Sequence, residues 1–210
     1  MRKILYHGSL EIISTPMYGQ GKVYNDYGQG FYCTESLELA KEWSCAERED
    51  GYVNQYEMDE TGLLILNLME KHYSVLHWLA ILMKYRKIRL SSAVMKRGRE
   101  WLLEHFLPDV DGYDVVIGYR ADDSYFSFAR AFVNNEISLE QLSYAMRLGK
   151  LGEQYVLKSQ KAFQAIHFLS YEGVDSVEYY VKRRARDEQA RNAYRKRWKR
   201  MISTVFICGI

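Results

Sequence analysis

Short runs rich in Val, Ile, Tyr and Phe recur along the chain, a composition typical of β-strands. Glycine and polar residues separate these runs, so each run is expected to form one short strand. The expected strands are residues 3–8, 30–34, 53–58, 63–68, 113–119, 153–158 and 164–170.

Stretches with helical spacing lie between the strands. The clearest are residues 36–49, for which Thr34 or Ser36 can serve as N-cap, and 138–149, where Ser138 begins a capping box. Because strands are grouped unevenly among the helices, an α+β fold is expected instead of a doubly wound sheet. The other expected helices are residues 72–86, 92–106, 123–134 and 176–202.

The chain can bury one full core, since 48% of its 210 residues are hydrophobic. It has two prolines and no stretch rich in Ser, Gly and Pro, so a flexible linker is not expected. One domain is expected over residues 1–174, followed by a basic C-terminal helical appendage over residues 175–210.

The charge of the chain is distributed unevenly. Residues 182–200 contain ten Lys and Arg against Asp187 and Glu188, which gives this stretch about +8 in a protein of net charge +2. Apolar residues recur in the same region at helical spacing, so one face of this helix is expected to pack against the acidic body. These residues are Val177, Tyr180, Val181, Tyr194, Trp198 and Met201.

Features of exported, membrane and metal-binding proteins are absent from the sequence. The longest apolar run, residues 76–83, is too short to span a bilayer, and no export signal follows Met1. A cytoplasmic protein without membrane contact is therefore expected. Cys33, Cys45 and Cys208 have no CxxC spacing and the five histidines are scattered, so no metal site and no disulfide framework are expected.

Three segments carry candidate chemistry, and the first is residues 5–9, Leu-Tyr-His-Gly-Ser. A glycine at the end of a strand lets the backbone approach a flat ligand, so His7, Gly8 and Ser9 can line a binding cleft. A histidine hydrogen-bonded within the strand would give the same pattern.

The second segment is residues 28–34, Gly-Gln-Gly-Phe-Tyr-Cys-Thr, followed by a helix that carries Trp43. Tyr32 and Trp43 are eleven positions apart and can offer aromatic faces to one planar ligand. Two aromatic residues of the hydrophobic core are the alternative.

The third segment is residues 153–157, Glu-Gln-Tyr-Val-Leu. Neighbouring side chains of a strand face opposite ways, so only one of Glu153 and Gln154 can point into a given cleft. A strand edge in solvent is the alternative.

Together the three segments resemble the motifs of the ADP-ribosyltransferase superfamily, in the His-Tyr-Glu branch of poly-ADP-ribose polymerases and diphtheria toxin. Polymerase domains have a Leu-Trp-His-Gly-Ser strand, similar to residues 5–9. They have a Gly-x-Gly-Ile-Tyr-Phe-Ala strand with a second tyrosine eleven residues after the first, similar to residues 28–34 and Trp43. Their catalytic strand begins Glu-Tyr-Ile-Val, which residues 154–157 match except at Gln154. The resemblance implies a split β-sheet core with flanking helices.

Residues 3–170 also resemble a bacterial family allied to these enzymes, whose members are often encoded beside small partner proteins in toxin–antitoxin-like pairs. The resemblance rests on residues 26–32, on residues 113–118, on Ala-Asp-Asp at 121–123 and on glutamine at position 154. It implies a small antitoxin as a partner.

The resemblance implies that NAD is the bound cofactor and substrate. His7 would bind the adenosine-side ribose, and Gly8 with Ser9 would hold the nicotinamide carboxamide. Tyr32 and Trp43 would enclose the nicotinamide ring and orient its glycosidic bond for cleavage.

Gln154 takes the place of the family's glutamate, so the implied catalytic set is His7, Tyr32 and Gln154. The glutamate steadies the positive charge that develops as nicotinamide leaves, and an amide carries no charge to do so. The loss of one such group commonly costs about 3 kcal/mol, or roughly a hundredfold in rate. Single transfer of ADP-ribose is therefore expected, and chain elongation is not.

Three acidic residues are candidates for the acceptor side of the reaction. Asp122 or Asp123 can orient the acceptor or act as its base, and Glu153 can do so if a bulge turns it inward. The alternative for Asp122 and Asp123 is a role in capping the helix that follows them.

The sequence favours a bacterial mono-ADP-ribosyltransferase that modifies a protein or a nucleic acid, as the toxin of a toxin–antitoxin or phage-defence pair. An NAD glycohydrolase and an NAD- or ADP-ribose-binding module without activity are the alternatives. A third hypothesis makes residues 182–200 a nucleic-acid-binding helix, for which a solvated face or a docking site for an acidic partner is the alternative.

Overall fold

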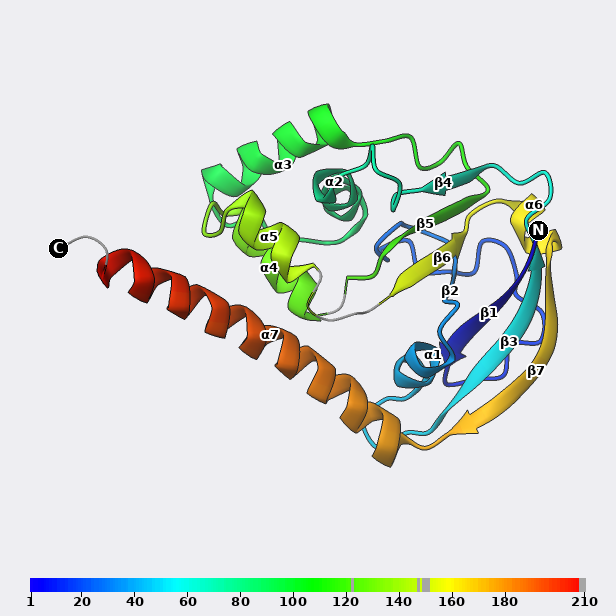
Figure 1. Cartoon of the computed structure of the whole chain (residues 1–210). Helices are drawn as coiled ribbons and strands as arrows, with labels where there is room; N and C mark the ends of the chain where they lie inside the picture. Colours follow the sequence, from blue (N-terminus) through cyan, green and yellow to red (C-terminus); the bar gives the residue numbers. More distant parts are fainter. Residues whose placement is uncertain (122, 147, 149–151, 208–210) are drawn as a thin grey trace.

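A computed structural model shows a mixed α and β structure, which confirms the α+β expectation (Figure 1). It describes residues 1–121, 123–146, 148 and 152–207, and within these ranges it leaves the side chains of residues 123, 124 and 199–207 undescribed. The strands are β1 (Arg2–Ser9), β2 (Phe31–Cys33), β3 (Gly51–Asp59), β4 (Ile65–Asn67), β5 (Val115–Tyr119), β6 (Glu153–Leu157) and β7 (Ile166–Val174). The helices are α1 (Leu37–Ser44), α2 (Val75–Tyr85), α3 (Ala93–Phe106), α4 (Asp123–Val133), α5 (Leu139–Ala145), α6 (Gln160–Gln164) and α7 (Ser176–Ile207).

The described strands form two open sheets. One has the order β1-β3-β7 and is antiparallel throughout, and the other has the order β2-β6-β5-β4, in which only β4 and β5 run parallel. An isolated bridge joins β1 to the end of β2, where the N–H of Tyr6 donates to the carbonyl of Thr34 (2.8 Å) and the N–H of Thr34 donates to Tyr6 (2.9 Å). Beyond this bridge β1 and β2 pair with different partners.

Serine side chains begin several of the helices, because a serine hydroxyl can accept the first unpaired backbone N–H groups. Ser36 caps α1, which decides between the two candidate N-caps, and Ser138 and Gln141 form the predicted capping box of α5. Further serine caps are Ser74, Ser92 and Ser159.

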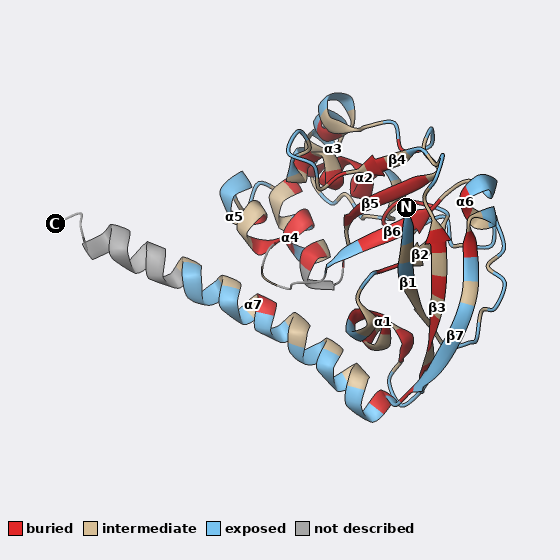
Figure 2. Cartoon of the chain, turned by 45° about the vertical axis from the view of Figure 1, so that its right-hand side comes forward, coloured by how far each residue is buried: buried red, intermediate tan, exposed pale blue. Residues whose placement is uncertain are grey.

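The helices α2 to α5 cluster beside the four-stranded sheet (Figure 1) and enclose the largest core. The centre of α2 is buried on every side, from Trp78 to Met83, which matches its uninterrupted apolar sequence. Figure 2 shows that β7 is exposed along most of its length, whereas β5 and β6 of the other sheet are largely buried.

Two expectations about the elements are wrong. The first helix ends at Ser44 and not at residue 49, because the chain turns back through Arg48, whose φ is +63°, and re-enters the sheet as β3. A short helix, α6, precedes β7 and was not expected. β7 therefore begins at Ile166 instead of residue 164.

α7 lies against α1 and α4. The guanidinium of Arg186 donates two hydrogen bonds, of 2.8 and 2.5 Å, to the buried carboxylate of Glu42 on α1. Farther along the helix, the ring of Tyr194 packs against Phe128 of α4 with 4.6 Å between centroids. These two contacts determine which side of α7 faces the rest of the protein. The division of the chain at residue 174 stays a prediction.

In the first turns of α7, the expected packing face is wrong at Val177 and Val181, whereas Tyr180 packs against a small core that includes Ala40 of α1. Val177 and Val181 are 79% and 60% exposed. Val181 lies five residues before Arg186, about 140° around the helix, so a helix oriented by Arg186 turns this valine outward. Met201 lies outside the described side chains. No helix among the described residues has both the length and the apolar character needed to cross a bilayer.

Gly8 allows α1 to pack closely on β1. A Cβ atom at Gly8 would lie 2.1 Å from the carbonyl oxygen of Ala40 and 2.8 Å from the backbone nitrogen of Ser44. Gly8→Ala is therefore expected to lower the free energy of unfolding by about 3 kcal/mol, because backbone has to shift. Urea denaturation measures the effect.

Gly173→Ala is the matched control, since Gly173 also lies in a strand but has open space where its Cβ would be. It is expected to change stability by less than about 0.5 kcal/mol. Equal effects of the two substitutions would contradict the close packing of α1 on β1.

Candidate functional site

A cleft of about 790 Å³ opens where β1 and β2 diverge, and it receives residues from both sheets. Its walls also include the segment after β1, residues just after α2 and β5, and Trp43 of α1. The predicted site residues that line it are His7, Gly8, Ser9, Tyr32, Trp43 and Gln154. Three segments far apart in the sequence thus meet at one cavity.

His7 is held by a short hydrogen bond between its Nδ1 and the carbonyl oxygen of Tyr32 (2.6 Å). Its ring also stacks on Phe31, with 4.3 Å between centroids. A carbonyl oxygen can only accept, so Nδ1 carries the proton. Burial lowers the pKa of His7 below 6.5, although the bond to Tyr32 acts in the opposite direction. The neutral ring therefore offers the lone pair of Nε2 as a hydrogen-bond acceptor.

Gly8 presents backbone groups to the cleft. The backbone N–H and carbonyl of Tyr6 point toward Thr34. Backbone groups two residues apart in an antiparallel strand point to the same side, so those of Gly8 point the same way as those of Tyr6. At Gly8, however, β2 has already turned away. The amide of Gly8 consequently faces the gap between the sheets, where it can bind a ligand's amide.

Ser9 is engaged in organising the segment after β1. Its hydroxyl donates to the carbonyl of Glu11 (2.5 Å) and accepts from the side chain of Asn54 (3.1 Å). Asn54 is fully buried and also accepts from the N–H of Ile13 (2.8 Å). The Ser9 hydroxyl has used its proton and one of its lone pairs in these bonds, so it can offer a ligand only its second lone pair. Its main contribution is therefore to shape the wall of the cleft.

Tyr32 is tied to the turn that precedes it. Its hydroxyl donates to the carbonyl of Gly28 (2.6 Å) and accepts from the N–H of Tyr27 (3.1 Å), and burial raises its pKa. Gly28 has a φ of +78°, and a Cβ there would lie 2.6 Å from the ring of Tyr85. Only glycine suits this turn. The ring of Tyr32 is thereby fixed against the cleft.

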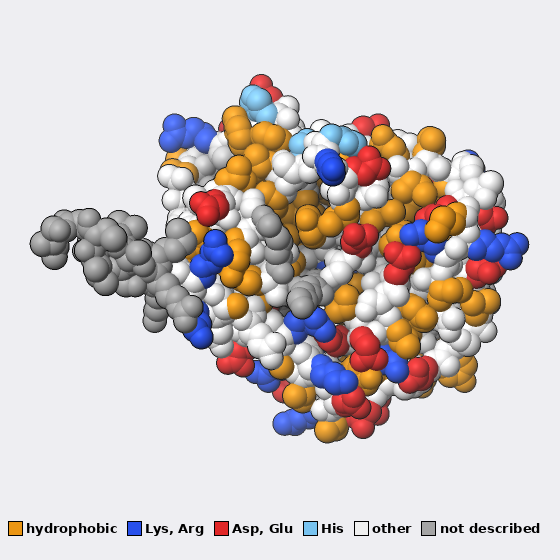
Figure 3. Space-filling view, in the orientation of Figure 1, with side chains coloured by type: hydrophobic (Ala, Val, Ile, Leu, Met, Phe, Trp, Pro, Cys, Tyr) orange, Lys and Arg blue, Asp and Glu red, His pale blue; other side chains and the backbone are white. Residues whose placement is uncertain are grey.

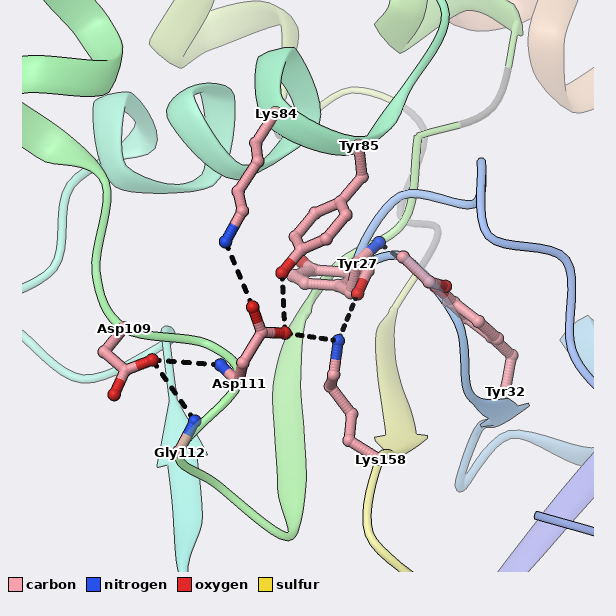
Figure 4. A network of polar contacts seen from close by, with 9 residues as sticks. Tyr27, Tyr32, Lys84, Tyr85, Asp109, Asp111, Gly112 and Lys158 are labelled. Atoms are coloured by element: carbon pink, nitrogen blue, oxygen red, sulfur yellow. Dashed lines mark hydrogen bonds and ion pairs between the residues drawn. The ribbon is translucent and has the colours of Figure 1, made fainter. Parts of the chain in front are cut away.

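Lys158, which lies outside the cleft, also binds the turn that precedes Tyr32 (Figure 4). The ammonium of Lys158 donates to the carbonyl of Tyr27 (2.7 Å) and lies 3.3 Å from the carboxylate of Asp111, which also accepts from Tyr85 (2.8 Å) and Lys84 (3.1 Å). Burial lowers the pKa of Lys158, and Asp111 opposes that effect. This network anchors the turn to the segment after β6.

Gln154 lies beside a buried carboxylate, Asp26, which the sequence did not single out. Nε2 of Gln154 donates to Oδ2 of Asp26 (3.2 Å) and to the carbonyl of Tyr119 (3.1 Å). Oδ2 also accepts from the N–H of Ala121 (2.9 Å), and Arg86 lies 3.4 Å from Oδ1. Burial raises the pKa of Asp26, while these neighbours act in the opposite direction. Both residues are more than nine-tenths buried.

One face of the Trp43 ring is covered by a cation. The guanidinium of Arg120 lies 3.8 Å from the centroid of its ring. Arg120 and Arg86 both line the cleft, and Lys22 lies on another part of its wall. A planar ligand that uses this face of Trp43 has to displace Arg120, whereas the three cations suit a ligand that carries phosphates.

The acceptor-side candidates are placed less fully. Glu153 begins β6, is exposed and does not line the cleft, as strand alternation requires when Gln154 points inward. Asp122 lies outside the described residues. Asp123 is the first residue of α4, and its side chain also lies outside them. Neither an acceptor role nor a capping role for these aspartates is tested.

The residues that sequence reasoning missed are Asp26, Arg86 and Arg120. Asp26 stands just before the Tyr-Gly-Gln-Gly turn, and an acidic residue at that place was the one local signal. Its contact with Gln154 spans 128 residues, so only the folded chain brings the two together.

The chain belongs to the family described as "Protein of unknown function (DUF3990)", whose model matches residues 3–168. These residues include every described residue that lines the cleft, whereas α7 follows the matched region. No curated protein and no solved structure matches the chain.

The lowered pKa of His7 has a consequence for stability. Below about pH 6.5 the unfolded chain takes up a proton that folded His7 does not, so the free energy of unfolding falls as the pH decreases toward the folded pKa. The loss is at most about 1.4 kcal/mol per pH unit. His7→Asn, which keeps a donor for Tyr32 but cannot titrate, is expected to lose less stability between pH 7 and pH 5. Urea denaturation at both pH values measures this, and equal losses would show that His7 titrates normally.

Proposed function

We propose that the chain is an NAD-dependent mono-ADP-ribosyltransferase, an enzyme of the glycosyltransferase class, and that its two sheets are the split core of that fold. The observation that carries the proposal is the meeting of the three motif-like segments at one cleft. His7, Tyr32 and Gln154 come from β1, β2 and β6, and all three line the same cavity. Its volume of about 790 Å³ lies within the range of cofactor sites.

The chemistry required of this cleft is a substitution at one carbon atom. The bond between C1′ of the ribose and the nicotinamide nitrogen breaks, and its electron pair neutralises the pyridinium ring. Positive charge then spreads over C1′ and the ring oxygen of the ribose. The acceptor's lone pair forms the new bond at C1′, and the acceptor gives its proton to a base or to water. With water as acceptor, the products are ADP-ribose and nicotinamide.

The polar groups of the cleft suit this reaction. Nε2 of His7 accepts from a ribose hydroxyl, and the backbone of Gly8 pairs with the nicotinamide carboxamide. The ring of Tyr32 forms one wall beside the nicotinamide, and Trp43 forms the other when Arg120 moves off it. Lys22 and Arg120 then lie where they can neutralise the diphosphate.

A second function, the binding of NAD or ADP-ribose without chemistry, is favoured by one observation. The guanidinium of Arg120 lies over one face of the Trp43 ring, so a nicotinamide ring can stack on that face only after Arg120 moves away. If Arg120 stays there, ADP-ribose fits better than NAD, because it has no nicotinamide to place. That the acceptor is a protein or a nucleic acid stays a prediction. So do the role as the toxin of a toxin–antitoxin pair and the small antitoxin partner.

A nucleic-acid-binding role of residues 182–200 also stays a prediction. Part of their charge is neutralised within α7, where Lys182 pairs with Glu178 (2.5 Å) and Arg191 with Asp187 (2.9 Å). On the face shown in Figure 3, acidic and basic side chains are interspersed among the described residues. This distribution favours nucleic acid less than an unbroken basic stripe would.

The test is incubation of the purified protein with NAD labelled in its adenine, together with bacterial lysate. Nicotinamide release and label on a macromolecule are expected. Trp43→Ala is expected to lower turnover at least about tenfold, because the ring is no longer held for cleavage. Trp101→Ala is the matched control, since Trp101 is exposed and does not line the cleft.

Each outcome separates the candidates. Nicotinamide release without label on a macromolecule would favour an NAD glycohydrolase. Binding of ADP-ribose without turnover, measured by calorimetry, would favour the binding module. A protein that binds neither NAD nor ADP-ribose and does not cleave NAD would contradict both functions.

A further inference from the structure

We propose that Asp26 is the positioning residue of the reaction, which aims the carbonyl oxygen of Gln154 into the cleft and supplies the negative charge that an amide lacks. The inference rests on the proposed function, and it assigns a role to a residue that stands at the start of the motif of residues 26–32 but was not among the candidate site residues. Asp26 lines the cleft, although it is 128 positions from Gln154.

The first step of the argument is the orientation of the Gln154 amide. Its nitrogen has two hydrogen atoms, and each has an acceptor, one on Asp26 (3.2 Å) and one on the carbonyl of Tyr119 (3.1 Å). Turning the amide over would place its oxygen against these two oxygens. The partners therefore set the orientation, and Oε1 is left to accept from a ribose hydroxyl.

The second step is the rigidity of the two acceptors. The carbonyl of Tyr119 also accepts from the hydroxyl of Tyr27 (2.7 Å) and from the indole N–H of Trp78 (3.0 Å), and both of these side chains are fully buried. Asp26 is held by the N–H of Ala121 at 2.9 Å. Gln154 thus sits in a frame that does not have to reorganise when charge develops in the cleft.

The third step concerns charge. A carboxylate in the usual glutamate position would face the developing cation directly, and Gln154 cannot do so. Asp26 lies one hydrogen bond behind it, only 7% exposed, where little water screens its charge. Burial raises the pKa of Asp26, and three features oppose that effect. The hydrogen bonds that it accepts from the described residues come from N–H donors, Arg86 lies 3.4 Å from Oδ1, and the positive charge of Arg120 acts in the same direction as that of Arg86.

The position of Arg86 does not cancel this effect. Its contact with Asp26 is a single approach of 3.4 Å to Oδ1, whereas Oδ2 is the oxygen that faces Gln154. Arg86 also lies over the ring of Phe126 at 5.2 Å, a contact that helps to hold the guanidinium without neutralising it. The negative side of the pair is the side that adjoins the glutamine.

The test compares the wild type with Asp26→Asn, Gln154→Glu and the double variant Asp26→Asn/Gln154→Glu. Asp26→Asn removes the charge and is expected to lower NAD turnover about a hundredfold. Its dissociation constant for NAD is expected to stay within about threefold, since the charge acts on the transition state and less on the bound substrate.

The double variant is the decisive arm. It moves the carboxylate from position 26 to position 154 and keeps a hydrogen bond between the two side chains, with the donor and acceptor exchanged. It gives up the hydrogen bond from position 154 to the carbonyl of Tyr119, which accounts for a remaining loss of turnover. Its turnover is expected to recover to within about tenfold of the wild type. Gln154→Glu alone places two carboxyl groups side by side, so one keeps its proton and a single charge remains. It is also expected to stay within about tenfold of the wild type.

Asp114→Asn is the control, because it removes a hydrogen-bonded carboxylate that lies outside the cleft. Asp114 accepts from the backbone of Leu64 and from Ser159, and it lies outside the cleft. It is expected to lower stability without lowering turnover per folded molecule. Thermal melting of every variant gives the folded fraction.

The outcomes distinguish this inference from the proposed function. A wild type that neither binds nor cleaves NAD would overturn both. An active wild type with an equally active Asp26→Asn would overturn the inference alone. So would a double variant no faster than Asp26→Asn, because a merely structural role for Asp26 cannot be rescued by charge at position 154. If Asp26→Asn does not fold, a folded double variant with less than about 1% of wild-type turnover contradicts the inference in the same way.

Discussion

The two hydrogen bonds between Tyr6 and Thr34 are the contact on which the architecture of the cleft depends. They join β1 to the end of β2 at one point, beyond which β1 continues along β3 and β2 continues along β6. Strands that separate leave backbone groups facing the gap, and those groups need a partner. A cleft with backbone donors and acceptors on its wall is the direct result.

Local and long-range features of this structure differed in how far the sequence revealed them. Serine caps and apolar periodicity are local, and they predicted most of the elements, including the capping box at Ser138. The end of α1 was missed because it is set by the return of the chain through Arg48. The outward turn of Val181 was missed because Arg186 and Glu42 orient α7, and no pattern within α7 contains that pairing.

The candidate site shows the same division. His7, Tyr32 and Gln154 were selected from short motifs, and they line one cavity because each motif lies where its strand meets the gap. Asp26 and Arg120 could not be found in this way. Their importance comes from what they touch, the amide of Gln154 and the ring of Trp43, and both contacts span long stretches of the chain.

The substitution of an amide for a carboxylate at position 154 has to be judged from its surroundings. An isolated glutamine can present either its oxygen or its nitrogen to a ligand, and the nitrogen would disfavour a developing cation. Here Asp26 and Tyr119 take both amide hydrogens, so the oxygen is presented. Under the proposed function, Asp26 would supply the carboxylate from one hydrogen bond behind Gln154. A motif that lacks its glutamate is therefore insufficient evidence for an inactive enzyme when a buried aspartate adjoins the glutamine.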